Sequence, residues 1–158
     1  MDAYLALPRL SHLLLSPDGE TIYLSNQSDG ALYAVGIAGG QPRLVSNKHN
    51  TPFHYYLHGI SPDGKTLAYV AVEGVEGHRR INMFTIPAAG GPDHRLSDVS
   101  YPNDGPEYSP DGKWIYFNSN RNGGWDIWRI PPSGAGPDDA KAERITHDDI
   151  EDWFAFTL

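Results

Sequence analysis

Short runs of alternating apolar and polar residues recur along the whole chain, bounded by glycine, proline, asparagine or aspartate. Residues 21–26, 66–70 and 114–119 are runs of this kind. Alternation with a period of two, rich in β-branched and aromatic residues, is typical of strands in an antiparallel sheet. No long segment has the 3.6-residue period of an amphipathic helix. The pattern therefore predicts an all-β chain of short antiparallel strands.

The tetrapeptide Ser-Pro-Asp-Gly occurs three times, at residues 16–19, 61–64 and 109–112, with spacings of 45 and 48 residues. Proline presets φ, aspartate accepts hydrogen bonds from nearby backbone and glycine takes positive φ, so each copy predicts a tight turn. One strand-like run precedes each turn and three follow it. Repeats of this length with four strands predict β-propeller blades. We expect these blades at about residues 10–46, 54–97 and 104–146.

Residues 151–158 match the start of the third repeat when shifted by 48 positions, and they predict one extra first strand. Residues 1–158 then form a single partial β-propeller of three blades plus one strand. Three blades leave two sheet faces bare, and monomers rarely expose large apolar areas. We expect closure into a six-bladed propeller by dimerisation, with 151–158 completing a blade across the junction. The alternative is a piece of a longer propeller.

The repeats resemble those of TolB-like β-propeller proteins, which also occur in the propellers of prolyl oligopeptidase-like enzymes. The resemblance rests on residues 58–64 (His-Gly-Ile-Ser-Pro-Asp-Gly), on residues 103–119 and on Asp-Ile-Trp-Arg at 126–129. It implies a propeller whose face or channel mouth binds a protein or peptide. The family pattern Asn-Trp-Phe-Pro-His is replaced here by Asp-Trp-Phe-Ala-Phe at 152–156, as in a strand adapted to close the array.

The first strands of a propeller line its central channel, so their polar and aromatic residues are the candidates for ligand contacts. These candidates are His54, Tyr55, Tyr56 and His58 in the second repeat, Asn103, Asp104 and Glu107 in the third, and Asp152 and Trp153 in the extra strand. The other interpretation is structural: tyrosines pack between blades, histidines bond backbone, and carboxylates cap turns. The carboxylates could bind a hard cation such as calcium. No His-x-x-x-His spacing supports zinc.

Catalytic residues are not predicted. The serines of the turns recur in every copy and serve the turn, and no Gly-x-Ser-x-Gly nucleophile elbow is present. We expect a non-catalytic scaffold that binds a protein or peptide and needs no cofactor. One alternative is the propeller portion of a prolyl oligopeptidase-like hydrolase, which a downstream Gly-x-Ser-x-Gly domain would establish. Another is a carbohydrate- or metal-binding propeller, which requires that His54, His58, Asp104 and Glu107 converge.

The charge, the cysteine count and the N-terminal sequence indicate which classes of partner and which compartments to expect. A formal net charge of −8 disfavours nucleic acid, whose phosphates require a basic surface. Cysteine is absent, which excludes disulfides and thiolate chemistry. The N-terminal residues lack the features of a signal peptide, and no apolar run approaches the roughly 18 residues of a membrane helix. We expect a soluble chain, cytoplasmic as given and periplasmic if a leader has been removed.

Overall fold

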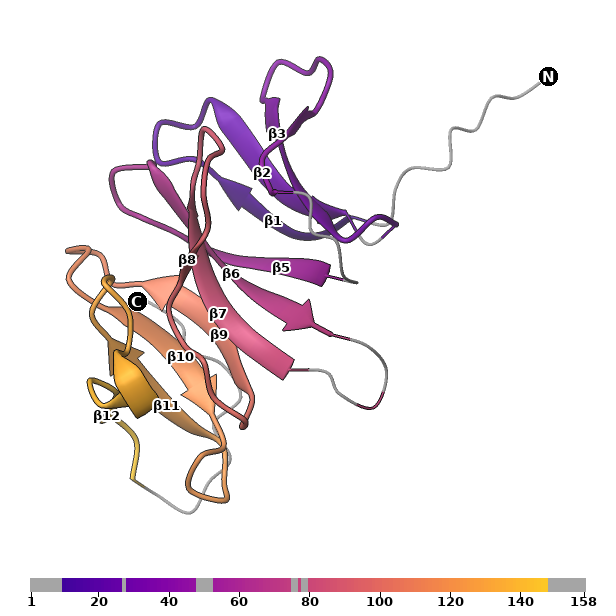
Figure 1. Cartoon of the computed structure of the whole chain (residues 1–158). Coiled ribbons are helices and arrows are strands. Elements are labelled where there is room, and N and C mark those ends of the chain that lie inside the picture. The colour runs from indigo at the N-terminus through magenta and orange to yellow at the C-terminus, as the bar shows by residue number, and fades with distance from the viewer. Residues whose placement is uncertain (1–9, 27, 48–52, 75–76, 78–79, 148–158) are drawn as a thin grey trace.

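The computed structural model describes residues 10–26, 28–47, 53–74, 77 and 80–147. They form three four-stranded antiparallel sheets in which neighbouring strands follow chain order, so the predicted all-β fold of propeller blades is confirmed. Figure 1 shows the sheets side by side, with the first strands β1, β5 and β9 adjacent. The predicted strand at 151–158 lies outside the described residues.

Blade 1 comprises β1 (Leu10–Leu15), β2 (Thr21–Asn26), β3 (Ala31–Gly36) and β4 (Arg43–Leu44). Blade 2 comprises β5 (Phe53–Ile60), β6 (Thr66–Glu73), β7 (Arg80–Pro87) and β8 (His94–Arg95). Blade 3 comprises β9 (Asn103–Tyr108), β10 (Ile115–Ser119), β11 (Asp126–Ile130) and β12 (Glu143–Arg144), with a short 3-10 turn, η1, at Pro137–Asp139.

The Ser-Pro-Asp-Gly turns join the first and second strands of all three blades by one set of contacts. In blade 3 the Ser109 hydroxyl donates to Asp111 at 2.7 Å and accepts from the Trp114 N–H at 3.0 Å. The Ser109 hydrogen bond, with the backbone of Lys113, lowers the pKa of Asp111 to about 2. Ser16 and Ser61 make the same pair of bonds. The serines therefore serve the turns.

Each first strand has a β-bulge or similar irregularity a few residues before its turn. The register shifts between Ser11 and Leu13 in β1 and between Leu57 and Gly59 in β5, so His12 and His58 are extra residues in their strands. In β9 the shift falls opposite the segment between Tyr116 and Asn118. A bulge bends its strand and re-aims the side chains beside it. The three irregularities therefore affect the direction of side chains along the inner strands.

The core lies between blades, and β6 contributes to both of its sides. Leu67, Tyr69 and Ala71 pack toward blade 1, whereas the intervening Ala68 and Val70 pack toward blade 3. Alternate residues of a strand point to opposite faces, so a continuous apolar run fills both seams. The seam between blades 1 and 2 buries Tyr23, Leu32, Ala34, Val45, Tyr55, Leu57, Phe84, Ile86 and Ala88 as well; the seam between blades 2 and 3 buries Met83, Leu96, Tyr108, Ile115, Phe117, Trp128, Ile130 and Ala135.

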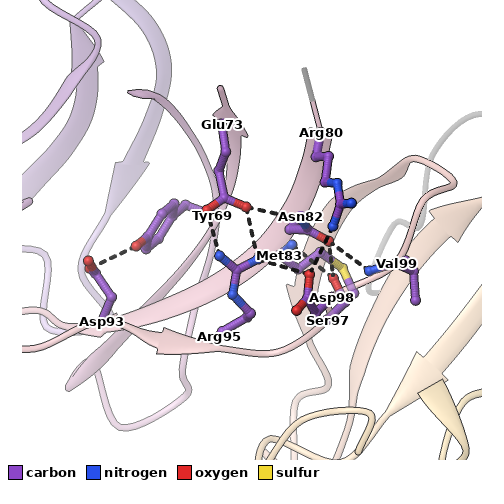
Figure 2. Close-up of polar contacts among 10 residues, drawn as sticks. All are labelled: Tyr69, Glu73, Arg80, Asn82, Met83, Asp93, Arg95, Ser97, Asp98 and Val99. Carbon is purple, nitrogen blue, oxygen red and sulfur yellow. Dashed lines mark hydrogen bonds and ion pairs between the residues drawn. The ribbon is translucent and has the colours of Figure 1, made fainter. Parts of the chain in front are cut away.

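Side chains hold the two-residue outer strand β8 to its blade (Figure 2). The guanidinium of Arg95 donates to both oxygens of Glu73, at 2.8 and 2.5 Å, and stacks on the Phe84 ring, with 4.5 Å between the guanidinium carbon and the ring centroid. The buried Asn82 donates to Glu73 and accepts from the Val99 N–H. These contacts connect β6, β7 and the chain that follows β8, which compensates for the short backbone pairing of the outer strand.

The two outer faces of the array carry the exposed large apolar residues of the described part of the chain. Ile37 of blade 1 is 54% exposed, whereas Ala88, which has the same place in blade 2, is 4% exposed. Ile145 of blade 3 is 40% exposed, whereas its counterpart Leu96 is 2% exposed. The remaining three belong to strands of blade 1: Leu13, Leu15 and Leu44. A blade of the same kind would cover both faces.

Gly59 sets the distance between the first strands of blades 2 and 3. A Cβ added there would lie 2.6 Å from the carbonyl oxygen of Pro106 and 3.1 Å from the Cα of Glu107. Both obstacles belong to the backbone of β9, which cannot move without shifting blade 3. Glycine at this position therefore allows the close approach of β5 and β9.

We expect Gly59→Ala to destabilise the protein by about 1–3 kcal/mol, the usual cost of overpacking a well-packed site. Urea unfolding followed by circular dichroism measures the change. Gly124→Ala is the matched control, because a Cβ at Gly124 meets no atom within 4 Å and we expect less than about 0.5 kcal/mol there. Equal stability of the two variants would contradict the close-approach role of Gly59.

Candidate functional site

A pocket of about 310 Å³ opens at the first strands and takes side chains from all three blades. We call it the inner-strand pocket. Blade 1 contributes His12, and blade 3 contributes Asp104. Blade 2 provides the remaining lining: Tyr56 and His58 of β5, Val70 and Val72 of β6, and Ile81 of β7. Polar groups and rings thus come from the first strands, and the apolar wall comes from β6 and β7.

The polar side of the inner-strand pocket is one connected group. The His58 Nε2 atom lies 3.3 Å from Oδ1 of Asp104, and the Gly105 N–H donates to the same oxygen at 2.8 Å. The His12 ring lies with its centroid 5.0 Å from that of His58 and meets the Tyr56 ring edge-on at 6.2 Å. The His58 side chain is 15% exposed and that of Asp104 is 54% exposed. The carboxylate therefore faces solvent while His58 supports it from behind.

Electrostatics keep Asp104 ionised and His12 neutral near pH 7. Burial raises the pKa of Asp104. The hydrogen bond and charge of His58, together with the Gly105 N–H, lower it by more, so the pKa lies below its usual range. Burial, followed by the charge of His58, lowers the pKa of His12, and Asp104 only partly opposes this. Such opposed environments for neighbouring titratable groups are typical of binding and catalytic sites.

Glu107 stands beside this group on β9. Burial raises its pKa to about 7, and no hydrogen bond or ion pair to it occurs within the described part of the chain. Its Oε2 would lie 3.1 Å from a Cβ at Gly59, the residue that follows His58. Glu107 does not line the inner-strand pocket, but its partial charge at neutral pH adds to the negative potential near it.

The other candidate residues have different surroundings. His54 is exposed, with its ring against Gly30 in the turn between β2 and β3. Tyr55 is buried between blades 1 and 2, where its hydroxyl donates to the Asn47 carbonyl at 3.0 Å and its ring contacts Tyr69. Asp152 and Trp153 lie outside the described residues. The structure thus brings together Tyr56, His58 and Asp104 and separates His54 and Tyr55 from them.

Asn103 belongs to a buried cluster around Arg121 at the end of blade 3. The Arg121 guanidinium donates to Asp139 at 2.9 Å and to Oδ1 of Asn103 at 3.2 Å, and it lies 4.3 Å from the Trp128 ring centroid. Burial raises the pKa of Asp139, and the charge of Arg121 opposes this effect. The cluster ties the hairpin between β10 and β11 to η1, so we assign Asn103 a structural role.

The sequence interpretation missed His12, which completes the inner-strand pocket from blade 1. His12 adopts a φ of 55°, which is unusual for a residue other than glycine. In the sequence His12 lies four residues before the first Ser-Pro-Asp-Gly turn, but no residue type marks the bulge that directs its side chain. The equivalent turn-proximal histidine, His58, lies three residues before the next turn.

The described residues show neither a metal-ligand cluster nor a membrane-spanning helix. They contain no group of three or more His, Asp or Glu side chains placed to hold a metal ion. Of the four residues named for a metal-binding propeller, His58 and Asp104 lie together, whereas the His54 ring lies against Gly30. No helix in the described ranges is long and apolar enough to cross a membrane.

Comparison with known proteins gives relatives that are longer than this chain. No protein-family model matches it. An uncharacterized protein of Agrobacterium fabrum, Atu1656, is 38% identical over 143 residues, which cover 89% of this chain and 44% of the relative. Dipeptidyl-peptidase 5 of Porphyromonas gingivalis is 27% identical over 127 residues, covering 73% of this chain and 18% of the peptidase. The chain therefore spans less than half the length of each of these relatives.

A solved structure described as a TolB from Agrobacterium tumefaciens superposes with a TM-score of 0.71 at 38% identity, covering 89% of this chain and 47% of the other. Four-stranded blades with side chains gathered at their first strands define this protein as a β-propeller. Its repeats are similar in sequence and in structure to those of this TolB.

We expect Glu107→Gln to raise stability at pH 8 by on the order of 1–2 kcal/mol, after allowance for partial exposure, and to have little effect near pH 4. The folded-state pKa of Glu107, about 7, lies above the unfolded value, so the wild-type protein loses stability as pH rises from about 4.5 to about 7. Urea unfolding at pH 4, 6 and 8 measures this. The exposed Glu20→Gln serves as the control, and a gain for Glu107→Gln that is independent of pH would refute the burial argument.

Proposed function

We propose that this chain is a non-catalytic binding propeller that holds a protein or peptide segment in the inner-strand pocket. The observation that carries the proposal is the convergence of His12, Tyr56, His58 and Asp104, from three blades, on one pocket with an apolar wall. Rigid concave sites that combine an apolar surface with a few convergent polar groups are typical of ligand binding. The binding uses side chains of the protein alone and needs no cofactor.

The chemistry of the lining favours binding over catalysis. Its groups are imidazoles, a phenol, a carboxylate and aliphatic side chains. His58 and Asp104 form the kind of pair that can activate a nucleophile, but neither serine nor threonine lines the described pocket. The hydroxyls of Ser16, Ser61 and Ser109 instead donate to the aspartates of their own turns.

A second candidate function is that of the propeller portion of a hydrolase. The observation that favours it is the 27% identity to dipeptidyl-peptidase 5, of which this chain spans 18%. In that case the inner strands would line the passage of peptides to a separate catalytic domain. A Gly-x-Ser-x-Gly hydrolase sequence in the same reading frame would support this candidate over the first.

The binding proposal predicts that peptides selected from a random display library require an open inner-strand pocket. Ile81→Trp should fill the pocket and weaken the selected peptides at least ten-fold in fluorescence polarisation. Tryptophan occupies the equivalent place in blade 3, at Trp125, so the substitution suits the fold. Ile145→Trp, outside the pocket, is the matched control and should bind normally. Selected peptides that bind both variants equally would show that the pocket is not the binding site.

We infer, for the assembly, that a second copy of the chain covers the bare faces of blades 1 and 3. The support is positional: Ile37 and Ile145 are exposed, while their counterparts Ala88 and Leu96 are buried in the seams on either side of blade 2. Each chain has two seams between its blades, and two further seams of the same kind would form between the two chains. Two copies of three blades give a closed ring of six, within the usual range for propellers.

Light scattering after size exclusion tests this assembly and should give the mass of two chains. Leu15→Glu places a charge on the bare face of blade 1 and should shift the mass toward one chain. Asn122→Glu adds the same charge at the exposed hairpin tip of blade 3 and should leave the mass unchanged. A folded wild-type protein with the mass of one chain would contradict closure by a second copy.

A further inference from the structure

Among the described residues, the contacts of Asp104 in the inner-strand pocket reach one of its two carboxylate oxygens. Both contacts of the carboxylate, from His58 and from the Gly105 N–H, reach Oδ1. Oδ2 makes no hydrogen bond to any described residue. An ionised carboxylate has acceptor sites on both oxygens. The Asp104 side chain is half-exposed, so Oδ2 can accept hydrogen bonds from a ligand while Oδ1 is held in place.

The charges around the inner-strand pocket favour a cation. Asp104 is ionised at neutral pH, and Glu107, with a pKa of about 7, carries a partial negative charge nearby. Burial keeps the pKa of His12 below its usual value, so this imidazole adds no full positive charge at pH 7. No lysine or arginine lines the described pocket. A cationic group of a ligand would thus meet a carboxylate whose partner among the lining side chains is the His58 imidazole, at Oδ1.

The shape indicates which kind of cation fits. Val70, Val72 and Ile81 form an apolar wall beside the Asp104 carboxylate, and Tyr56 adds an aromatic ring. A ligand that suits this arrangement has an apolar stem and a charged end, as lysine and arginine do. Aromatic faces also attract guanidinium and ammonium groups. The volume of about 310 Å³ lies at the lower limit for ligand pockets, which suits a single side chain.

We propose that the inner-strand pocket binds an arginine or lysine side chain of the partner segment, with the stem on the Val70–Val72–Ile81 wall and the cation on Oδ2 of Asp104. This inference rests on the proposed binding function and specifies its partner as a basic segment. Arginine fits better than lysine, because a guanidinium has several donors in a planar fork and stacks on rings.

Nuclear magnetic resonance titration of the full chain tests the inference with small probes. N-acetyl-arginine amide should shift the Gly105 amide and the imidazole signals of His12 and His58 and should saturate them. N-acetyl-citrulline amide has nearly the same shape without the charge. We expect it to half-saturate the same signals only at a concentration at least ten-fold higher than that of the arginine probe. Lysine and norleucine amides form a second pair with the same expectation.

The variant Asp104→Asn should reduce the preference for arginine over citrulline to less than three-fold. Asp138→Asn, an exposed aspartate in η1, is the matched control and should keep the full preference. Equal binding of the charged and neutral probes, or a preference that survives in Asp104→Asn, would overturn the inference. If the display-selected peptides lack basic residues and still lose affinity for Ile81→Trp, this inference fails while the proposed function holds. If the selected peptides bind Ile81→Trp as well as the wild-type protein, both fail.

Discussion

Each sheet of this protein has two faces to bury, and that requirement organises the rest of the structure. A four-stranded sheet with apolar side chains on both sides is stable only between two neighbours. Blade 2 meets the condition: Leu67 and Tyr69 of β6 are buried against blade 1, and Val70 of the same strand is buried against blade 3. Burial of a large apolar side chain contributes about 1.5–3 kcal/mol, so the seams supply most of the driving force.

The inner-strand pocket is a consequence of how the seams end. Along the seam between blades 2 and 3, Met83 and Phe117 are completely buried. Toward the start of β5 and β9, the half-buried Val72 and Ile81 have no such cover from blade 3, and the space beside them remains open. The bulges then direct His12 and His58 to this opening. The apolar wall of the pocket thus results from packing between the blades, and its histidines are directed there by the bulges in β1 and β5.

The blades could be predicted because the Ser-Pro-Asp-Gly turn recurs every 45 to 48 residues with one alternating run before it and three after it, and both signals are local in the sequence. The site was only partly predictable. Tyr55 and Tyr56 are adjacent, and the strand alternation sends one into each seam, but only the three-dimensional register shows that Tyr56 reaches the pocket. His12 could not be predicted, since its direction depends on a bulge that no residue type specifies. Asn103 pairs with Arg121, a partner 18 residues away that only the folded chain brings close.

The proposed binding and the proposed assembly would use different parts of the same architecture. The inner-strand pocket lies within one chain and depends on the seams on both sides of blade 2, which are complete without a partner. The bare faces lie at the opposite ends of the array, on blades 1 and 3. A substitution on a bare face should therefore change the assembly and leave the pocket intact, whereas the close contact at Gly59 controls the position of Asp104 relative to His58. The proposed ligand recognition would therefore depend on the position of β9 against β5 rather than on closure of the ring.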